Sequence, residues 1–254
     1  MARHARRKTK AAGEGASPTK PLSGKVALIT GASRGIGFAI AKALADKGCD
    51  LVLSARNESA LKKAGRELND VRVLAQACDV TDGRSVDSLF KAVRNEFGRL
   101  DFLINNAGTS HAAAEVDRFN PKVWQDVIAT NLTGMFLCTR AALPLMSEPA
   151  AIVNNLSVAA NRVFAGQSAY CASKHGALGF TNTLREEVRG RGIRVIALLV
   201  GATDTEIWDQ FAPGAPRAGM LHSETIARAV LDALLLPAEA TVEEVIIRPT
   251  RNAF

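Results

Sequence analysis

Short apolar runs alternate with helix-like segments along nearly the whole chain, beginning at Lys25. A run such as 26–29 is too short for a helix and lacks polar residues, which is typical of a strand buried on both faces of a sheet. A segment such as 81–97 instead repeats its apolar residues every three or four positions, which predicts an amphipathic helix. Regular alternation of the two indicates parallel strands joined by right-handed crossovers.

The pattern therefore predicts a single doubly wound α/β domain, a seven-stranded parallel sheet with helices on both faces. We place this domain at residues 22–254, with no internal repeat and no second linker. The expected strands are 26–29, 51–53, 71–77, 102–104, 151–154, 193–200 and 245–247. The expected helices are 36–46, 58–68, 81–97, 121–146, 169–188 and 225–236.

Residues 1–21 differ in composition from the rest of the chain. The formal net charge is +7, but residues 1–20 hold six Lys and Arg residues against Glu14 alone. The remainder is therefore nearly neutral, which argues against a nucleic-acid-binding face on the folded domain. The segment has too few apolar residues to join a core, so we predict a disordered, solvated basic tail rather than a transit peptide.

The cysteines and histidines give no sign of a metal site. Cys49, Cys78, Cys138 and Cys171 are scattered, with no CxxC pair and no HExxH motif nearby. This usage is typical of a reduced, cytoplasmic protein. No apolar run reaches the roughly 18 residues that a membrane helix needs, so we expect no membrane span.

A glycine-rich turn follows the first predicted strand and opens the next helix. It reads Thr30-Gly31-Ala32-Ser33-Arg34-Gly35-Ile36-Gly37. Gly31 permits a tight turn, Gly35 lets a pyrophosphate approach the backbone, and Gly37 lets the helix pack closely on the strand. In this setting the turn predicts a bound dinucleotide, and the alternative is a glycine turn without a ligand.

Tyr170 and Lys174 are four residues apart on a predicted helix, so both side chains emerge on one face. A nearby cation favours the phenolate form of a phenol whose pKa is ordinarily about 10. Tyr170 would then exchange a proton with a carbonyl or alcohol oxygen, while Ser157 donates a hydrogen bond to that oxygen. Taken alone, the pair also fits a buried Tyr beside a solvated Lys.

Together these motifs resemble the classical branch of the short-chain dehydrogenase/reductase family. The family's TGxxxGxG loop matches residues 30–37, its NNAG motif matches 105–108, and its catalytic serine and YxxxK motif match Ser157, Tyr170 and Lys174. The resemblance covers the chain from about residue 23 to the end. It implies a Rossmann-like fold that transfers a hydride between a nicotinamide dinucleotide and a carbonyl or secondary alcohol.

The same resemblance implies further roles. Lys174 also binds the nicotinamide ribose, Asn131 holds a water for a proton relay, and Thr205 meets the nicotinamide carboxamide. The implied catalytic residues are Asn131, Ser157, Tyr170 and Lys174. The expected cofactor-binding residues are Gly31, Ser33, Arg34, Gly35, Ile36, Gly37, Arg56, Asp79, Val80, Asn106, Ala107, Gly108, Tyr170, Lys174, Gly201 and Thr205. Asp79 could instead be the N-cap of helix 81–97, but Thr81 is the better cap, which leaves Asp79 free for the adenine side.

We expect NADP rather than NAD as the cofactor, in the manner of an NADP-preferring branch of the family. The selecting position lies about 20 residues past the glycine loop, at the end of the second strand, where an acid would bind the ribose 2′-OH. Ala55 occupies that position. Arg56 and Arg34 are the residues expected to reach a 2′-phosphate, and their alternative is a role as solvated surface charges.

Three further features bear on substrate and assembly. Residues 201–220, with Trp208 and Phe211, predict a loop that closes over the substrate. Asn155 stands where the family more often has an apolar residue, so its side chain needs a partner. Helices 121–146 and 169–188 are expected to pair subunits of a homodimer or homotetramer through apolar outer faces at Val127, Phe136, Ala177 and Phe180.

Two functional hypotheses remain. The first is an NADP-dependent oxidoreductase acting on a 3-oxoacyl, small hydroxy acid or other ketone substrate, a carbonyl reductase in broad terms. The second is a dinucleotide-sensing binding protein of the same fold, whose basic tail contacts a partner or nucleic acid. The complete set of Asn131, Ser157, Tyr170 and Lys174 favours the enzyme. His111, which follows the NNAG motif, is expected to be a loop residue rather than a pocket residue.

Overall fold

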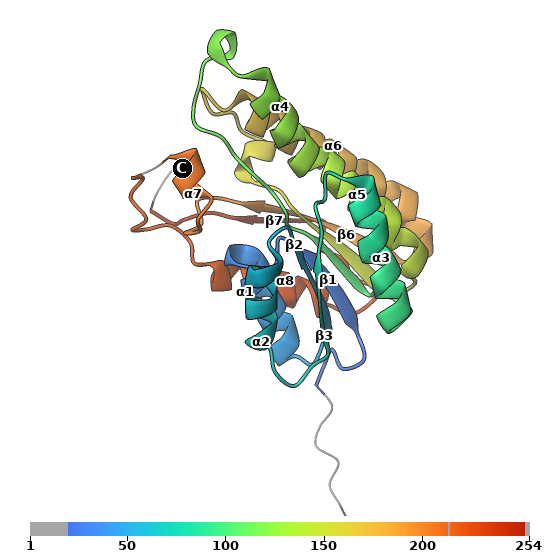
Figure 1. Ribbon diagram of the computed structural model, residues 1–254. Coiled ribbons are helices and arrows are strands. Elements are labelled where there is room, and N and C mark those ends of the chain that lie inside the picture. Colours follow the sequence, from blue (N-terminus) through green and yellow to red (C-terminus); the bar gives the residue numbers. More distant parts are fainter. Residues whose placement is uncertain (1–19, 213, 252–254) are drawn as a thin grey trace, which may run out of the picture.

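A computed structural model describes residues 20–212 and 214–251, and within them seven parallel strands form one sheet (Figure 1). The strand order is β3-β2-β1-β4-β5-β6-β7. Successive strands are therefore added on one side of β1 up to β3 and on the other side from β4 onward, so the order reverses between β1 and β4. The predicted doubly wound sheet is confirmed, with each strand within about two residues of its expected bounds. The strands are β1 (Val26–Thr30), β2 (Asp50–Ala55), β3 (Val73–Ala77), β4 (Phe102–Asn105), β5 (Ala150–Asn155), β6 (Ile193–Val200) and β7 (Glu244–Ile247).

Helices cover both faces of the sheet, as Figure 1 shows. On one face lie α1 (Gly35–Asp46), α2 (Glu58–Arg66) and α8 (Ser223–Leu234), and on the other lie α3 (Gly83–Phe97), α5 (Gly134–Ala142) and α6 (Ser168–Val188). Two shorter helices, α4 (Pro121–Ile128) and α7 (Trp208–Phe211), lie beyond the carboxyl ends of the strands. Asn57 caps α2 by accepting a hydrogen bond from the backbone N–H of Ala60.

Two hydrophobic cores form because successive strand residues point to opposite faces. In β1, Ala27 and Ile29 pack with α1, α2 and α8, while Val26 and Leu28 pack with α3, α5 and α6. Every residue of β1 is buried. The uninterrupted apolar runs in the sequence are thus explained by burial on both sides of the sheet.

The predicted helical stretch 121–146 is confirmed, since residues 121–145 are helical without a break, but it is not α-helical throughout. It consists of α4, a π-helical segment Ala129–Thr133, α5 and a 3-10 turn Leu143–Leu145. Gly134, at the start of α5, lies so near Val80 that an added Cβ would come within 2.7 Å of the valine side chain. This close approach brings α5 against the end of β3.

Two of the four residues expected on outward faces are instead buried within the subunit. Val127 is 1% exposed on α4, which packs against α6, and Ala177 is fully buried where α6 packs on β6. Phe136 is 44% exposed, and Phe180 packs edge-on against it with ring centres 6.1 Å apart.

The expected basic tail lies almost wholly in residues 1–19, outside the described residues. Among the residues described, no helix is both long and apolar enough to cross a membrane.

Asp101 links β1 and β4 through hydrogen bonds at the amino ends of the two strands. The site described below lies at the carboxyl ends. Its carboxylate is 1% exposed and accepts hydrogen bonds from the backbone N–H of Val26 at 3.0 Å, from Lys25 at 3.0 Å, and from two nitrogens of Arg99. Removing the carboxylate would leave the Val26 N–H buried without an acceptor.

Asp101→Ala should therefore lower the free energy of unfolding by about 2–3 kcal/mol, because hydrogen bonds to a buried charged group are lost and a donor is stranded. For a chain of this size that corresponds to a fall in Tm of roughly 5–10 °C. Thermal unfolding followed by circular dichroism measures it. Asp87→Ala, on the exposed side of α3, is the control and should change the free energy by no more than about 0.5 kcal/mol. Equal Tm values for both variants would contradict the role of Asp101.

Candidate active site

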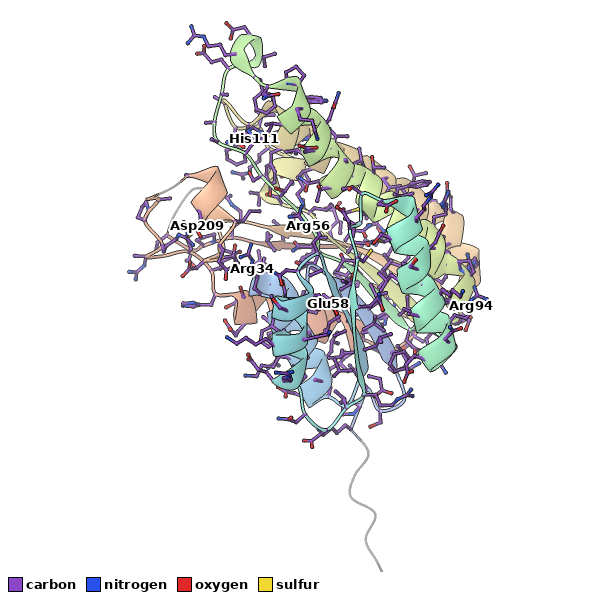
Figure 2. The ribbon with its side chains drawn as sticks, in the orientation of Figure 1. Arg34, Arg56, Glu58, Arg94, His111 and Asp209 are labelled. Atoms are coloured by element: carbon purple, nitrogen blue, oxygen red, sulfur yellow. The ribbon has the colours of Figure 1, made fainter. Side chains whose placement is uncertain are left out.

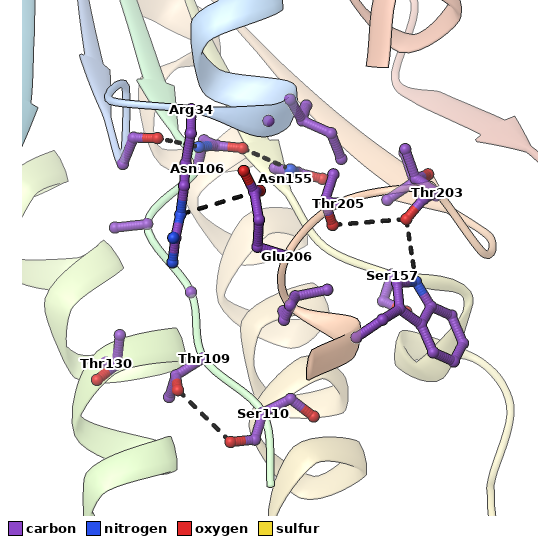
Figure 3. Close-up of a pocket in the computed structure, with 18 of the residues that line it drawn as sticks. Arg34, Asn106, Thr109, Ser110, Thr130, Asn155, Ser157, Thr203, Thr205 and Glu206 are labelled. Carbon is purple, nitrogen blue, oxygen red and sulfur yellow. Dashed lines mark hydrogen bonds and ion pairs between the residues drawn. The ribbon is translucent and has the colours of Figure 1, made fainter. Parts of the chain in front are cut away.

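A cavity of about 700 Å³ opens at the carboxyl ends of the strands, where the strand order reverses (Figure 3). In doubly wound sheets, ligands bind at this crevice because loops to opposite faces diverge there. Residues from the ends of β1 to β6 line it, together with the segment that follows β6. All but two of the sequence-predicted site residues lie on its wall, and the exceptions are Gly37 and Asn131.

The glycine loop forms one wall of the cavity. Gly31 and Gly35 have φ of +65° and +55°, which a glycine adopts without the strain that a Cβ would bring. Gly37 lies behind the loop, where an added Cβ would come within 2.4 Å of Asn106 Nδ2 and 2.5 Å of the Gly31 carbonyl oxygen. Gly37 thus serves close packing rather than direct contact with a ligand, whereas Ser33, Arg34 and Ile36 line the cavity.

Asn106 joins the ends of three strands beneath the cavity. Its Nδ2 donates to the carbonyl oxygens of Thr30 at 2.9 Å and Gly31 at 3.2 Å, and its Oδ1 accepts from Asn155 Nδ2 at 2.8 Å. The Thr30 hydroxyl accepts the backbone N–H groups of Asn106 and Ala107. Asn155, which the sequence left in need of a partner, thus finds one in Asn106, and Figure 3 shows it between Asn106 and Thr205.

Ser157, Tyr170 and Lys174 meet at one end of the cavity. Lys174 Nζ lies 5.7 Å from the centre of the Tyr170 ring and donates to the carbonyl oxygen of Asn155 at 3.1 Å. Ser157 is the N-cap of the 3-10 turn Val158–Ala160 after β5, where its hydroxyl accepts a hydrogen bond from the backbone N–H of Ala159. The structure therefore places in one cluster three residues that the sequence separates.

Burial governs the electrostatics of this cluster. Desolvation lowers the pKa of Lys174 to about 8. Burial raises the pKa of Tyr170 above its usual value, although a hydrogen bond with Ser157 opposes the shift. The lowering of the phenol pKa expected from Lys174 is not found, because burial raises this pKa and only the hydrogen bond with Ser157 lowers it.

Asn131 lies one layer behind the cavity, in the π-helical segment. Its Oδ1 accepts from the backbone N–H of Thr109 at 2.8 Å, and its Nδ2 donates to the Thr109 carbonyl oxygen and to Ser173 Oγ, each at 3.0 Å. The side chain holds residues 108–110 against α6, directly beneath Gly108. Its expected part in a proton relay stays a prediction.

His111 is a loop residue outside the cavity wall, as expected, but it makes a contact that the sequence did not reveal. It is 6% exposed, and its Nε2 accepts the backbone N–H of Tyr170 at 3.3 Å while its Nδ1 lies 2.8 Å from the Ala112 carbonyl oxygen. A carbonyl accepts only from an N–H, so Nδ1 carries the proton and Nε2 is the acceptor. The Tyr170 N–H lies in the first turn of α6, where backbone N–H groups have no acceptor within the helix itself. Only the fold reveals this cap, because the two residues are 59 apart.

The opposite end of the cavity is polar. Arg56, Asp79 and Val80 line it beside the ends of β2 and β3. Burial raises the pKa of Asp79, but hydrogen bonds from the backbone N–H and hydroxyl of Thr81, together with the charge of Arg56, outweigh burial and hold that pKa below its usual value. The expectation that Thr81 caps this helix was wrong. The helix α3 begins at Gly83 and Asp82 is its N-cap, while Thr81 donates hydrogen bonds to the Asp79 carboxylate through its backbone N–H and its hydroxyl.

Arg34 and Arg56 lie beside this polar end, on the α1 and α2 side in Figure 2. Glu58, the nearest acid in the sequence, pairs with Lys62 one helical turn away. The acid that approaches Arg34 is Glu206, from the segment after β6, with an Arg34 Nε to Glu206 Oε2 distance of 3.9 Å. Figure 3 shows the two side chains facing each other across the cavity mouth.

Segment 201–220 covers the cavity, with Gly201, Thr205 and Trp208 among its lining residues. The indole Nε1 of Trp208 donates to the Thr203 carbonyl oxygen at 3.0 Å. The side chain of Phe211, expected to share this role, lies outside the described residues.

The residues present fit a nicotinamide dinucleotide. The glycine loop turns into the N-terminus of α1, which favours an anion such as a pyrophosphate. Cationic side chains lie at one end and a phenol, a hydroxyl and an amine at the other, within a single cavity. This is the order in which a dinucleotide would present its adenosine and its reactive ring.

Comparisons with known proteins agree with this arrangement. The model of the short chain dehydrogenase family matches residues 25–215. A 3-oxoacyl-[acyl-carrier-protein] reductase from Vibrio cholerae is 38% identical over 188 residues, which are 73% of this chain and 76% of that protein. An alcohol dehydrogenase from Thermococcus sibiricus, solved with 5-hydroxy-NADP, is 33% identical with a TM-score of 0.84, covering 90% of this chain and 97% of that one. A metagenomic short-chain oxidoreductase, solved with NADP, is 32% identical with a TM-score of 0.79, covering 91% and 100%.

Tyr170 is the single tyrosine of the chain, so the ultraviolet absorbance of tyrosinate reports its ionisation alone. In the protein without cofactor the titration midpoint should lie above about 10, because burial disfavours the phenolate. Ser157→Ala should raise the midpoint further, since it removes the hydrogen bond that favours the phenolate. Ser110→Ala, another serine on the cavity wall, is the control and should leave it unchanged. A wild-type midpoint below 10 would contradict the dominance of burial.

Proposed function

This chain belongs to the short-chain dehydrogenase family of oxidoreductases, and on that premise we propose that it transfers a hydride between NADP(H) and a ketone, an aldehyde or the corresponding alcohol. The observation that carries the proposal is the meeting of Ser157, Tyr170 and Lys174 at one end of a cavity whose other end holds Arg34 and Arg56. The 3-oxoacyl reductase and the alcohol dehydrogenase among its relatives act on substrates of this chemical kind.

The chain's own residues would handle the proton. The bound nicotinamide supplies or accepts the hydride. During reduction the carbonyl oxygen accepts a proton from Tyr170, and a raised phenol pKa keeps that proton in place at neutral pH. Ser157 donates a hydrogen bond where negative charge develops on the same oxygen. Lys174, with its pKa of about 8, is mostly protonated at pH 7 and stabilises the phenolate that remains.

His111 is a positioning residue in this scheme. Its imidazole holds the main chain of Tyr170 through the N-terminus of α6, and the Gln167 side chain donates to the His111 carbonyl oxygen at 3.3 Å. The ring is packed edge-on against Phe119, with centres 4.6 Å apart. The phenol is thus positioned by a contact to its backbone in addition to its hydrogen bond with Ser157.

His111→Phe should lower kcat about tenfold or more while leaving the Kd for NADPH nearly unchanged, because a small displacement of Tyr170 weakens proton transfer and not cofactor binding. His111→Gln should recover most of the lost kcat, since its Oε1 can accept the same N–H. Tyr170→Phe, which removes the proton donor, sets the level of residual turnover. Steady-state kinetics with one carbonyl substrate measures all three. Loss of NADPH binding in the Phe variant, or no recovery in the Gln variant, would contradict the positioning role.

We also propose NADP over NAD. Ala55 leaves the end of β2 without an acid, Glu58 is held by Lys62, and Arg56 and Arg34 line the cavity there. Glu206 competes for Arg34 only through a long and largely exposed ion pair, which a phosphate would displace at little cost. Two solved relatives that hold NADP or a derivative of it support the preference.

The ratio of kcat/KM for NADPH to that for NADH should be on the order of a hundred or more, because two charge-assisted hydrogen bonds reach the 2′-phosphate. The double variant Ala55→Asp, Arg56→Ala should erase or invert this ratio. Glu206→Gln is the matched control at Arg34 and should raise the ratio, since it removes the competing carboxylate. A wild-type preference for NADH would show that the arginines do not bind the phosphate.

Assembly and location are part of the same proposal. We propose a homodimer or homotetramer that buries the exposed faces of α4 and α5, where Trp124 and Phe136 are 40% and 44% exposed. We propose a cytoplasmic location, which the four free and buried cysteines support.

A further inference from the structure

The part of the cavity beyond Ser157 and Tyr170 is walled by apolar side chains. They come from the turn after β5, the loop before α6 and segment 201–220. The described residues are Val158, Phe164, Ile207, Trp208, Ala212, Ala215, Pro216 and Met220. Trp208 presents a hydrophobic ring there, because its indole N–H is engaged by the Thr203 carbonyl oxygen.

The charged side chains among the described lining residues lie elsewhere. Arg34, Arg56, Asp79 and Glu206 belong to the glycine loop and to the mouth beside it. Lys174 is buried and directs its amine toward the Asn155 carbonyl oxygen. None of these is placed to meet a charge on the substrate portion that lies against the apolar wall.

Segment 201–220 contains one cation, Arg217, and its guanidinium is already engaged. It donates to Asp204 at 2.8 Å, to the Thr205 carbonyl oxygen at 2.7 Å and to Asp209 at 2.7 Å. These contacts tie the end of the segment back to its beginning, and Arg217 is not part of the cavity wall. The arginine thus holds the lid in shape and offers no counter-charge to a substrate carboxylate.

We infer that the substrate is a neutral carbonyl compound bearing a bulky apolar group, such as an aryl or alkyl ketone, and not an oxo acid. This rests on the proposed function. The carbonyl oxygen takes the polar position at Ser157 and Tyr170, and the apolar group lies against Trp208 and its neighbours. A carboxylate on that group would be buried without a partner, which strongly disfavours binding. On reduction the carbonyl carbon gains the hydride of NADPH, the oxygen gains the proton of Tyr170, and NADP⁺ is released.

The test compares two ketones with one skeleton, methyl 4-acetylbenzoate and 4-acetylbenzoate, which differ in charge far from the reacting carbonyl. The full chain is assayed for NADPH oxidation, and binding of each ketone to the NADP⁺-loaded protein is measured by calorimetry. The ester should have a kcat/KM and an affinity at least about a hundredfold higher than the acid. Calorimetric binding of NADPH alone reports separately on the proposed cofactor.

A charge placed on the wall should change this ratio. Ala215→Lys adds a cation to the wall, and Ala215→Met, of similar length without charge, is its matched control. The lysine variant should bind and reduce 4-acetylbenzoate at least about tenfold better than the methionine variant, with little gain for the ester.

Three results would overturn the inference: wild-type protein that accepts the acid as well as the ester, variants that do not differ toward the acid, or binding of neither ketone at millimolar concentration. If NADPH still binds when one of these results is found, the inferred substrate class is refuted and the proposed function is not. If NADPH does not bind at all, the proposed function fails, and calorimetry of each ketone with the protein alone then decides the charge selectivity of the wall.

Discussion

The hydrogen bonds of Asn106 are the constraint on which the rest of the site depends. One carboxamide spans the ends of β1, β4 and β5: it donates to the Thr30 and Gly31 carbonyl oxygens and accepts from Asn155. Gly37 must lack a Cβ for the same carboxamide to fit. The glycine loop and the strand that leads to Ser157 are therefore held at a fixed separation. The cofactor end and the reactive end of the cavity thus rest on the same hydrogen-bonded residues.

The reactive end of the site combines burial with directed hydrogen bonds. Lys174 is anchored on the carbonyl oxygen of Asn155, and Tyr170 is held through its backbone by His111. Burial raises the pKa of the phenol above its usual value and lowers that of the amine to about 8, which moves the two values apart. At neutral pH the phenol therefore keeps its proton while the amine is mostly charged.

The cavity is divided by chemistry along its length. Cations at the β2 end suit phosphate groups, and apolar side chains beyond Tyr170 suit a hydrophobic substrate. Segment 201–220 contributes to both, because Glu206 faces Arg34 while Trp208 faces the apolar part. Arg217 stabilises this segment by joining its two ends, so a short stretch without extensive secondary structure keeps a defined surface toward both ligands.

The sequence by itself determined the sheet, the helices on both faces, the glycine loop and the cluster of Ser157, Tyr170 and Lys174, because burial on both sides and motif spacing leave local signals. It could not show that the helix predicted at 121–146 contains a π-helical segment, or that Val127 and Ala177 are buried, since helix–helix packing leaves no such local pattern. Thr81 was a plausible cap by residue type, yet Asp82 caps α3. The cap of Tyr170 by His111 and the engagement of Arg217 were decided by tertiary structure alone. Both contacts join residues that are distant in sequence, and the partners meet only because the folded loops bring them together at the ends of the strands.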